Sequence, residues 1–264
     1  MWNPHEPLTK RARYGMGAVS YLLVLVVWST IALLELASSN ALPAPWEVAE
    51  GFMVLASYNE AKDSYLLLDA TIASTTRIAI ATFMVTVIGI PVGILMGASP
   101  RINAVLGPLL DPFRSAPIVS VLPILVIWMG IDEALKVAFL VLGSVVYLVP
   151  MTRDAIVAVP REVYISLKDL GATDFEAIRH GVLPMAMPRI WDAVTVAVSI
   201  MWTYITVAEY VNADSGLGQL ITHAKRFSAM DQVFAGILVI IFLALITNLS
   251  LVAAKRALFP WETE

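Results

Sequence analysis

The stretch from Tyr21 to Leu34 reads YLLVLVVWSTIALL and holds no charged residue. About 20 apolar residues in an α-helix, each rising about 1.5 Å, cross the hydrocarbon core of a bilayer. A transmembrane β-strand would alternate apolar with polar side chains, whereas this run is apolar on every face. The stretch therefore predicts a membrane-spanning helix.

The composition of the 264-residue chain fits several such helices. Hydrophobic residues make up 59% of it and charged residues only 14%, against roughly 25% charged residues in soluble domains. The apolar runs predict an all-α integral membrane protein with six transmembrane helices in the lipid bilayer. The predicted spans cover residues 16–37, 70–98, 104–129, 134–152, 185–211 and 232–254.

Several kinds of chemistry are missing from the sequence. The chain has no cysteine, its three histidines are scattered, and its net charge of −4 comes without a basic stripe. It also lacks the H-E-x-x-H and G-x-S-x-G motifs of hydrolases. We therefore predict that the chain is not an enzyme, holds no metal and binds no nucleic acid.

Lys and Arg residues are distributed unevenly between the connections. With the N-terminus inside, eleven of the 17 face the cytoplasm and four face outward, while Arg77 and Arg114 lie within spans. This excess predicts that both termini are cytoplasmic. It also places the long connection at 153–184 in the cytoplasm. The outward set is Lys62, Lys136, Lys225 and Arg226.

The connection at 153–184 predicts two short helices joined by a turn. Arg161 to Leu170 is helix-forming, Gly171 ends that helix, and Thr173 or Asp174 begins a second one that reaches about His180. From the residues alone, this connection is either a solvated loop or a surface that binds a partner.

The same segment resembles the EAA loop of ABC-importer permeases, whose pattern is E-A-A, three residues, G, nine residues and I-x-L-P. The matching residues are Asp169-Leu170-Gly171-Ala172, the nine positions from Ala172 to His180, and Leu183-Pro184. Ile165-Ser166-Leu167 replace the E-A-A triplet, and Gly181 stands where Ile is usual.

Further matches follow in order along most of the chain and resemble the permeases for nitrate, taurine, alkanesulfonates and similar small solutes. They are Leu42-Pro43-Ala44-Pro45, Arg77, Gly89-Ile90-Pro91-Val92-Gly93, Arg114 with Pro117 and Pro123, Trp128-Met129-Gly130-Ile131, Ala208-Glu209, Gly216-Leu217-Gly218 and Pro260-Trp261.

The resemblance implies a type I ABC importer permease fold in a bacterial cytoplasmic (inner) membrane. The implied partners are a second permease subunit in a homodimer or heterodimer, an extracytoplasmic solute-binding protein and cytoplasmic ABC ATPase subunits. The chain has no G-x-x-x-x-G-K-[ST] phosphate loop, so ATP and Mg belong to the separate ATPase, and no cofactor is expected here.

The resemblance also implies a coupling helix at about Ala172 to Arg179, which enters the ATPase with Phe175 as its anchor. The implied ATPase-coupling residues are Leu170, Gly171, Ala172, Thr173, Asp174, Phe175, Glu176, Arg179, Leu183 and Pro184.

The predicted spans and the resemblance together divide the chain into four parts. Residues 1–15 form a cytoplasmic N-terminal segment, and 16–69 hold the first span and an external interfacial helix at Trp46 to Leu55. Residues 70–256 form the permease core with the EAA-like loop 153–184, and 257–264 form a cytoplasmic tail.

One face of the fifth span carries polar side chains at steps of three or four. Such a face either lines the solute pathway or lets helices pack closely while its hydroxyls bond to backbone carbonyls. Trp202 and Tyr204 flank the face. The pathway candidates are Thr195, Ser199, Trp202, Thr203, Thr206 and Tyr210.

Charged residues inside the spans require a partner or water. Arg77 and Glu209 lie toward the outer side, and we predict that they pair. Asp111, Arg114 and Asp192 lie toward the inner side, where they pair likewise or reach the headgroups.

Small residues and prolines shape the second and third spans. Gly89, Gly93 and Gly97 stand four apart and predict a groove for another helix. Pro91 in one span, with Pro117 and Pro123 in the next, predicts kinks.

Three functions compete. The first is the membrane subunit of an ATP-driven importer for a small solute. The second is a secondary transporter driven by an ion gradient, which predicts an internal repeat with carboxylates near the midplane. The third, an intramembrane enzyme, lacks any recognisable motif. The sequence does not identify the solute.

Overall fold

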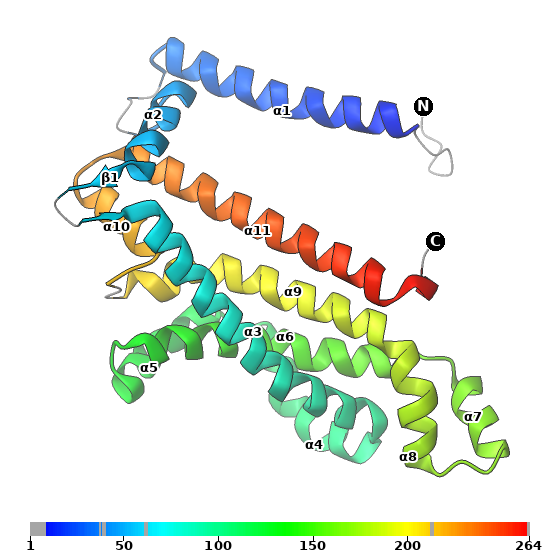
Figure 1. The fold of residues 1–264 in the computed structure, drawn as a ribbon. Helices are drawn as coiled ribbons and strands as arrows, with labels where there is room; N and C mark the ends of the chain where they lie inside the picture. The colour runs from blue at the N-terminus through cyan, green and yellow to red at the C-terminus, as the bar shows by residue number, and fades with distance from the viewer. Residues whose placement is uncertain (1–8, 37, 39–40, 61–62, 212–213, 263–264) are drawn as a thin grey trace. The chain divides into compact units, whose positions relative to one another are not determined.

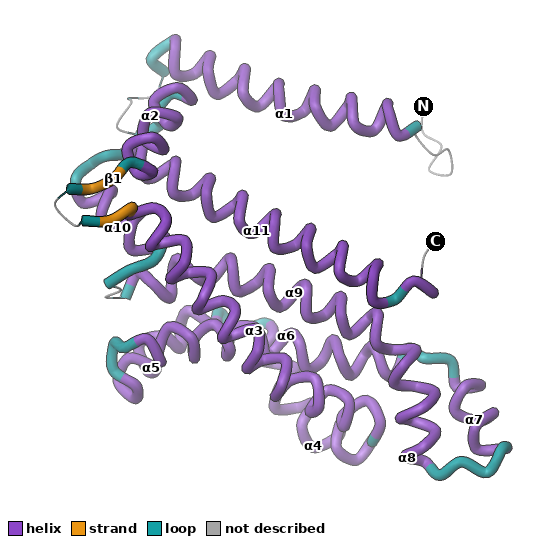
Figure 2. Tube along the Cα trace, viewed as in Figure 1, coloured by secondary structure: helices purple, strands orange, loops and turns teal. Residues whose placement is uncertain are grey.

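The structure is a computed structural model that describes residues 9–36, 38, 41–60, 63–211 and 214–262. Residues 1–8 and 263–264 of the predicted terminal segments, and Lys62 of the outward-facing set, lie outside these ranges. The described residues are mostly helical (Figures 1 and 2). They form two compact units, which we describe separately.

The first unit comprises residues up to Leu66 together with Ile221–Leu238. Its helix α2 buries one face, formed by Val48, Gly51 and Leu55. Gly51 lies directly on the start of α11, because a Cβ at this position would be 2.7 Å from the carbonyl carbon of Asp231. The elements of this unit are α1 (Lys10–Leu33), α2 (Pro45–Ala56), β1 (Tyr58–Asn59), β2 (Ser64–Tyr65) and the first part of α11 (Met230–Leu258).

Helix α2 is the predicted interfacial helix, and β1 and β2 follow it as a short antiparallel pair. Pro45 at the start of α2 supplies the fixed backbone angle that suits a first helical turn. Glu47 accepts a hydrogen bond from the amide of Ala44 at 2.7 Å, which satisfies a free donor at the helix start.

The second unit comprises Leu67–Leu220 and Val239–Glu264. It contains most of the long helices and the predicted cytoplasmic connection. Its helices are α3 (Leu66–Ala98), α4 (Pro100–Leu110), α5 (Leu122–Met129), α6 (Glu133–Val157), α7 (Arg161–Asp169), α8 (Asp174–Ala177), α9 (Leu183–Tyr210), the start of α10 (Leu217–Arg226) and the rest of α11. Four shorter turns are η1 (Asp111–Arg114), η2 (Ile118–Val121), the π-turn η3 (Ile178–Val182) and η4 (Pro260–Glu262).

Helix α6 is the centre of the second unit. In the apolar 18-residue stretch of α6, 56% of the residues are buried. The corresponding stretches of α1 and α11 contain no buried residue. It packs along α9, and their common core is a small apolar cluster. The cluster consists of Ala155, Ile156, Val182, Ala186 and Ile190.

The three glycines of α3 form the predicted groove, and α6 fills it. The contacts pair Gly89 with Leu148, Gly93 with Thr152, and Gly97 with Ile156. Because both residue numbers rise together, α3 and α6 run parallel. A Cβ on Gly93 would lie 2.7 Å from the carbonyl oxygen of Val149, so only glycine lets the two backbones approach this closely.

Helix α9 runs antiparallel to α6. The ring of Tyr204 near the end of α9 lies 5.8 Å from the ring of Phe139 near the start of α6, while Val182, just before α9, packs on Ile156 near the end of α6. The unit therefore has one end with the starts of α3 and α6, and another with α7 and α8.

The third predicted span is not one straight helix. Within the described residues, five helices are long and apolar enough to cross a membrane, or six if the bent pair Pro100–Arg114 and Ile118–Met129 counts as one span. The two halves of that pair are bent by 99°. Pro112 and Pro117 lack an amide hydrogen at the bend, which weakens the helix there and agrees with the kink that Pro117 predicted, whereas α3 continues through Pro91.

Candidate functional site

The turn between α7 and α8 is closed by a glycine and a capping box. Gly171 has a φ of +90°, which suits a glycine after a helix end. Thr173 Oγ1 accepts from the amide of Glu176 at 3.3 Å, and Glu176 Oε2 accepts from the amide of Thr173 at 2.8 Å. The predicted turn and helix start are therefore present.

Asp174 fastens α8 to α7. Its Oδ1 accepts a hydrogen bond from the hydroxyl of Tyr164 at 2.8 Å and lies 2.8 Å from Nζ of Lys168. The hydrogen bond to this carboxylate raises the pKa of Lys168 above its usual value, so the lysine keeps its charge to higher pH. The orientation of the two helices is thereby held by polar contacts at the surface.

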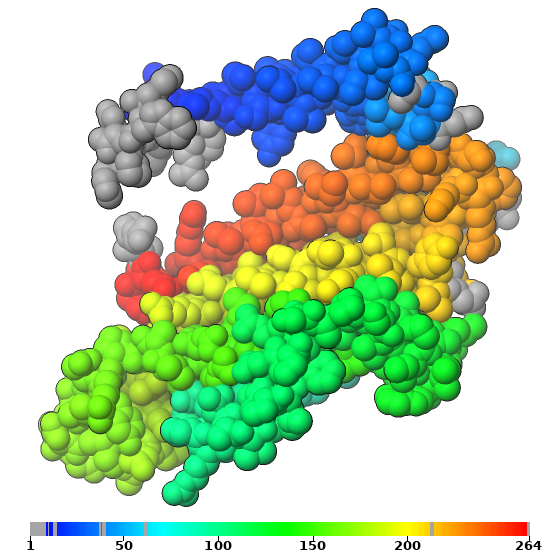
Figure 3. Space-filling model, turned by 180° about the vertical axis from the view of Figure 1, so that it is seen from behind, coloured from blue at the N-terminus to red at the C-terminus, as the bar shows by residue number. Residues whose placement is uncertain are grey.

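The α7–α8 helix pair protrudes from one end of the second unit (Figure 3). Leu170 is 84% exposed and Phe175 is 68% exposed. The guanidinium of Arg179 lies 6.0 Å from the centre of the Phe175 ring. Large apolar side chains with a charged neighbour, presented on a capped turn, are typical of a surface that a partner covers.

The sequence predicted that the second helix of this pair ends near His180, and this prediction is wrong. Helix α8 continues through the π-turn Ile178–Val182 into α9, so the helical backbone runs from Asp174 to Tyr210. Pro184 lies directly after the π-turn and cannot donate a hydrogen bond to the preceding turn, yet the helical backbone continues through it.

The two departures from the EAA pattern compensate each other. Leu167 stands where the pattern has its second Ala, and Gly181 stands where it has Ile. A Cβ on Gly181 would collide with Leu167 and lie 3.2 Å from Val163. The larger side chain on α7 therefore occupies the space that the smaller residue on the π-turn leaves free.

A buried ion cluster lies at the opposite end of the second unit, around Arg77. This side chain is 5% exposed, and its Nη1 lies 2.7 Å from Oε1 of Glu209. The predicted pair is therefore present. Its Nε and Nη2 donate to the carboxylate of Glu133 at 2.6 and 2.7 Å. Nη1 also donates to the carbonyl oxygen of Ser215 at 2.8 Å.

Glu209 ties the cluster to the turn before α10. Its Oε1 accepts from the hydroxyl of Ser74 at 2.7 Å, and its Oε2 accepts from the amide of Gly218 at 2.7 Å. Gly216 has a φ of +121°, and a Cβ there would collide with the carboxyl of Glu209. The Gly-Leu-Gly motif therefore lets the turn close over a buried carboxylate.

The sequence did not single out Glu133, and it placed Lys136 in the outward-facing set, whereas the structure buries Lys136 within α6. Lys136 is 2% exposed, and its Nζ lies 2.7 Å from Oε1 of Glu133. Two cations and two carboxylates balance the charge of the cluster. The signal was present, because an acid and a base three residues apart at the start of an apolar helix share one face.

The three charges predicted toward the inner side do not pair with one another. Asp111 lies 3.2 Å from Arg153, and Asp192 lies 2.7 Å from Lys255. The sequence placed these two basic residues in cytoplasmic connections. Arg114 is exposed and forms no ion pair within the described residues.

The hydroxyls of the polar face on α9 bond to their own helix. Thr195, Ser199 and Thr203 each donate to the carbonyl four residues earlier, at 3.0, 2.9 and 3.2 Å. Ser199 Oγ also accepts from Asn248 of α11 at 3.4 Å. Ser199, Thr203 and Tyr210 are nevertheless exposed, so the role of this face in transport stays a prediction.

Of the two aromatic residues beside this face, Trp202 is buried and Tyr204 is half-buried. Trp202 is 4% exposed, and its Nε1 has no hydrogen-bond partner within the described residues. Tyr204 packs edge-on against the backbone at Gly143, where a Cβ would lie 2.8 Å from its ring. The role of these two residues in transport also stays a prediction.

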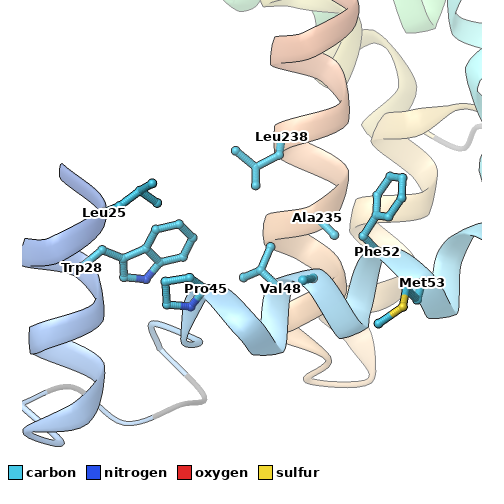
Figure 4. Close-up of a pocket in the computed structure, with 9 residues that line it drawn as sticks. Leu25, Trp28, Pro45, Val48, Phe52, Met53, Ala235 and Leu238 are labelled. Carbon is cyan, nitrogen blue, oxygen red and sulfur yellow. The ribbon is translucent and has the colours of Figure 1, made fainter. Parts of the chain in front are cut away.

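The first unit contains an apolar pocket of about 490 Å³, in contrast to the polar face of α9 (Figure 4). Its walls come from α1, α2 and α11 and are apolar, and Nε1 of Trp28 is occupied by the carbonyl oxygen of Pro43 at 2.9 Å. A site without free polar groups cannot orient a polar solute. The lining residues are Leu25, Trp28, Pro45, Val48, Ala49, Phe52, Met53, Ala235 and Leu238.

Comparison with known proteins agrees with this architecture. Residues 89–263 match the family described as binding-protein-dependent transport system inner membrane component. The chain is 34% identical over 261 residues to the taurine transport system permease protein TauC of Escherichia coli K12, covering 98% of this chain and 93% of the relative. It is 28% identical to the putative aliphatic sulfonates transport permease protein SsuC of Bacillus subtilis 168, covering 96% and 90%.

Solved structures support the fold. The chain superposes on the MetNI methionine ABC transporter in an inward-facing conformation with a TM-score of 0.66 and 20% identity, covering 75% of this chain and 98% of that one. A crystal structure of an amino acid ABC transporter gives a TM-score of 0.61 at 18% identity, covering 75% and 94%. The chain therefore belongs to the family of binding-protein-dependent transport system inner membrane components, and is a multi-pass permease subunit of an ABC importer with a type I fold.

Proposed function

We propose that this permease imports a small solute that carries an anionic group, such as taurine, an alkanesulfonate or nitrate. The names of the two relatives, a taurine and an aliphatic sulfonate permease, support this solute class. A solute-binding protein delivers the solute from outside, and this chain with a second permease subunit forms the path.

The observation that carries the proposed mechanism is the exposed apolar pair Leu170 and Phe175 on the capped α7–α8 helix pair. Separate ATPase subunits, which hold ATP and Mg, bind this helix pair. Phe175 enters the ATPase as an aromatic anchor, and the acids and Arg179 around it form a polar rim. Movement of the ATPases on binding ATP is then transmitted to α9.

The proposed orientation puts the α7–α8 helix pair and both termini in the cytoplasm of a bacterial cell. The excess of Lys and Arg in the connections on this side supports it. The end of α11 supports the same side for the C-terminus, because Lys255 lies 2.7 Å from Asp192 near the start of α9. The Arg77 cluster then lies at the outer end, where the solute-binding protein docks.

Co-purification tests the coupling surface. The tagged chain is purified from its native host in mild detergent, as wild type and with the changes Gly171→Asp and Phe175→Ala. A P-loop ATPase identified by mass spectrometry is expected with wild type and is expected to be lost from the variant. Phe227→Ala is the matched control, since Phe227 is 72% exposed but lies outside the helix pair.

Two results would contradict the proposal. The ATPase could remain bound to the double variant, which would place the coupling surface elsewhere. Alternatively, the wild-type chain could purify without an ATPase and carry taurine into liposomes in the absence of ATP, which would indicate a secondary transporter. Uptake of taurine, ethanesulfonate and nitrate by the reconstituted complex then tests the solute class.

A further inference from the structure

The segment between α3 and α6 must cross the membrane. The contacts of Gly89 with Leu148 and of Gly97 with Ile156 show that α3 and α6 run parallel. Helix α6 therefore begins at the membrane surface where α3 begins, and residues 99–132 carry the chain back across. They do so as two helical halves bent by 99°.

The bend lies near mid-depth, measured along α6. The hydroxyl of Tyr147 donates to the carbonyl oxygen of Arg114 at 3.1 Å, and a Cβ on Gly143 would lie 3.8 Å from Ile118. At about 1.5 Å per residue, the 25-residue helix α6 is about 37 Å long, with Gly143 and Tyr147 about 15 and 21 Å from its start. The residues from Arg114 to Ile118 therefore lie close to the centre of the bilayer.

The backbone at this depth is irregular and uncovered. Positions 111–117 are all exposed. The amides of Ser115 and Ala116 bond only three residues back, to Pro112 and Phe113 at 3.1 and 3.3 Å. Within the described residues, the carbonyls of Ser115 and Ala116 accept no backbone hydrogen bond. Non-helical backbone at membrane depth occurs only where protein covers it or where it lines a water-filled cavity.

Arg114 adds a charge to the same place. It is exposed and without an ion-pair partner among the described residues. The nearest acid on its own turn, Asp111, accepts from Arg153 with both carboxylate oxygens at 3.2 Å. An unpaired arginine near the bilayer centre faces the interior of a bundle or a water-filled cavity rather than lipid.

We propose that the break from Arg114 to Pro117 lines a water-filled solute passage at mid-depth, and that Arg114 faces this passage and attracts solutes with an anionic group. The inference rests on the proposed function for the identity of the solute, but the wall of the passage and its charge are properties of this chain. It makes Arg114 a residue that selects solutes by charge.

Cysteine accessibility tests the wall directly, because the native chain contains no cysteine. Ser115→Cys is introduced in the complete transporter in native membrane vesicles. Two water-soluble reagents are used: the anionic 2-sulfonatoethyl methanethiosulfonate and the cationic 2-(trimethylammonio)ethyl methanethiosulfonate. We expect both to modify Ser115→Cys, and neither to modify Leu245→Cys, a 54% exposed position on α11, in the same time. Ala116→Cys replaces Ser115→Cys if that variant is not assembled.

The charge of Arg114 is read from the ratio of the two rates. Removing one positive charge about 6 Å from the cysteine should slow modification by the anionic reagent about threefold in bulk water and speed modification by the cationic reagent about threefold. Both effects are larger at the lower dielectric of a narrow passage. Adding Arg114→Gln is therefore expected to lower the ratio of anionic to cationic rate by about tenfold or more. Arg114→Lys is expected to retain most of the ratio.

Each part of the inference can fail separately. If both Ser115→Cys and Ala116→Cys react no faster than Leu245→Cys, the break faces lipid or packed protein, and there is no passage here. If they react but Arg114→Gln leaves the ratio unchanged, Arg114 does not select by charge. Neither readout needs ATP or a transported solute, so failure of the proposed function would leave these results interpretable.

Discussion

Replacing Arg77 with methionine is expected to destabilise the protein strongly. The side chain keeps most of its aliphatic length but loses five hydrogen bonds to Glu133, Glu209 and Ser215. The side chain of Glu209, with no exposed area, then loses the only cation paired with it among the described residues. Breaking a buried ion pair in this way costs about 3–5 kcal/mol. At about 2–4 °C per kcal/mol for a chain of this size, Tm should fall by about 6–20 °C.

Thermal unfolding of the detergent-purified protein, followed by tryptophan fluorescence, measures this shift. Lys255→Met is the control, since Lys255 is 23% exposed and its partners Asp192 and Glu262 are 53% and 40% exposed, and each such pair contributes about 1 kcal/mol or less. Arg77→Met combined with Glu209→Gln should recover part of the loss, because no carboxylate is left buried alone. The reasoning is refuted if Arg77→Met lowers Tm no more than Lys255→Met does.

Two further changes test the packing of the helices. Gly93→Ala places a Cβ 2.5 Å from Thr152 and 2.7 Å from a backbone oxygen, so it should cost about 1–3 kcal/mol in the same unfolding assay, whereas Gly17→Ala, with no atom within 4 Å, should not lower Tm. Gly181→Ile should weaken co-purification of the ATPase by displacing α7, and adding Leu167→Ala should restore it; no rescue would mean that the two positions do not share space.

The sequence predicted the elements that depend on local composition. The glycine spacing at 89, 93 and 97 indicated a groove without identifying α6 as its partner. The capping residues of α8 and the pairing of Arg77 with Glu209 followed from residue type and approximate depth. Each of these predictions required information about a single helix only, or about two opposite charges that must pair because an isolated charge inside a membrane is costly.

Other features depend on which helix ends meet, and a single sequence does not contain that information. Arg153 and Lys255 were counted as cytoplasmic charges, but the sequence did not identify them as the partners of Asp111 and Asp192. The apolar run at 104–129 was predicted as one span with a kink at Pro117, but nothing in the sequence indicated that its halves are bent by as much as 99°. Pro184 suggested a helix end, yet the helix continues through it directly after the π-turn.

The continuity of α8, the π-turn and α9 has a mechanical consequence. One continuous helical backbone runs from Asp174 to Tyr210 (Figure 1), with the exposed Phe175 near one end and the buried Glu209 near the other. No slack joint separates these ends, so a torque applied at Phe175 either bends the π-turn or rotates Glu209 against Arg77. Under the proposed coupling to the ATPases, the helix transmits rotation from Phe175, and the stiffness of the π-turn Ile178–Val182 determines how much of that rotation reaches Glu209.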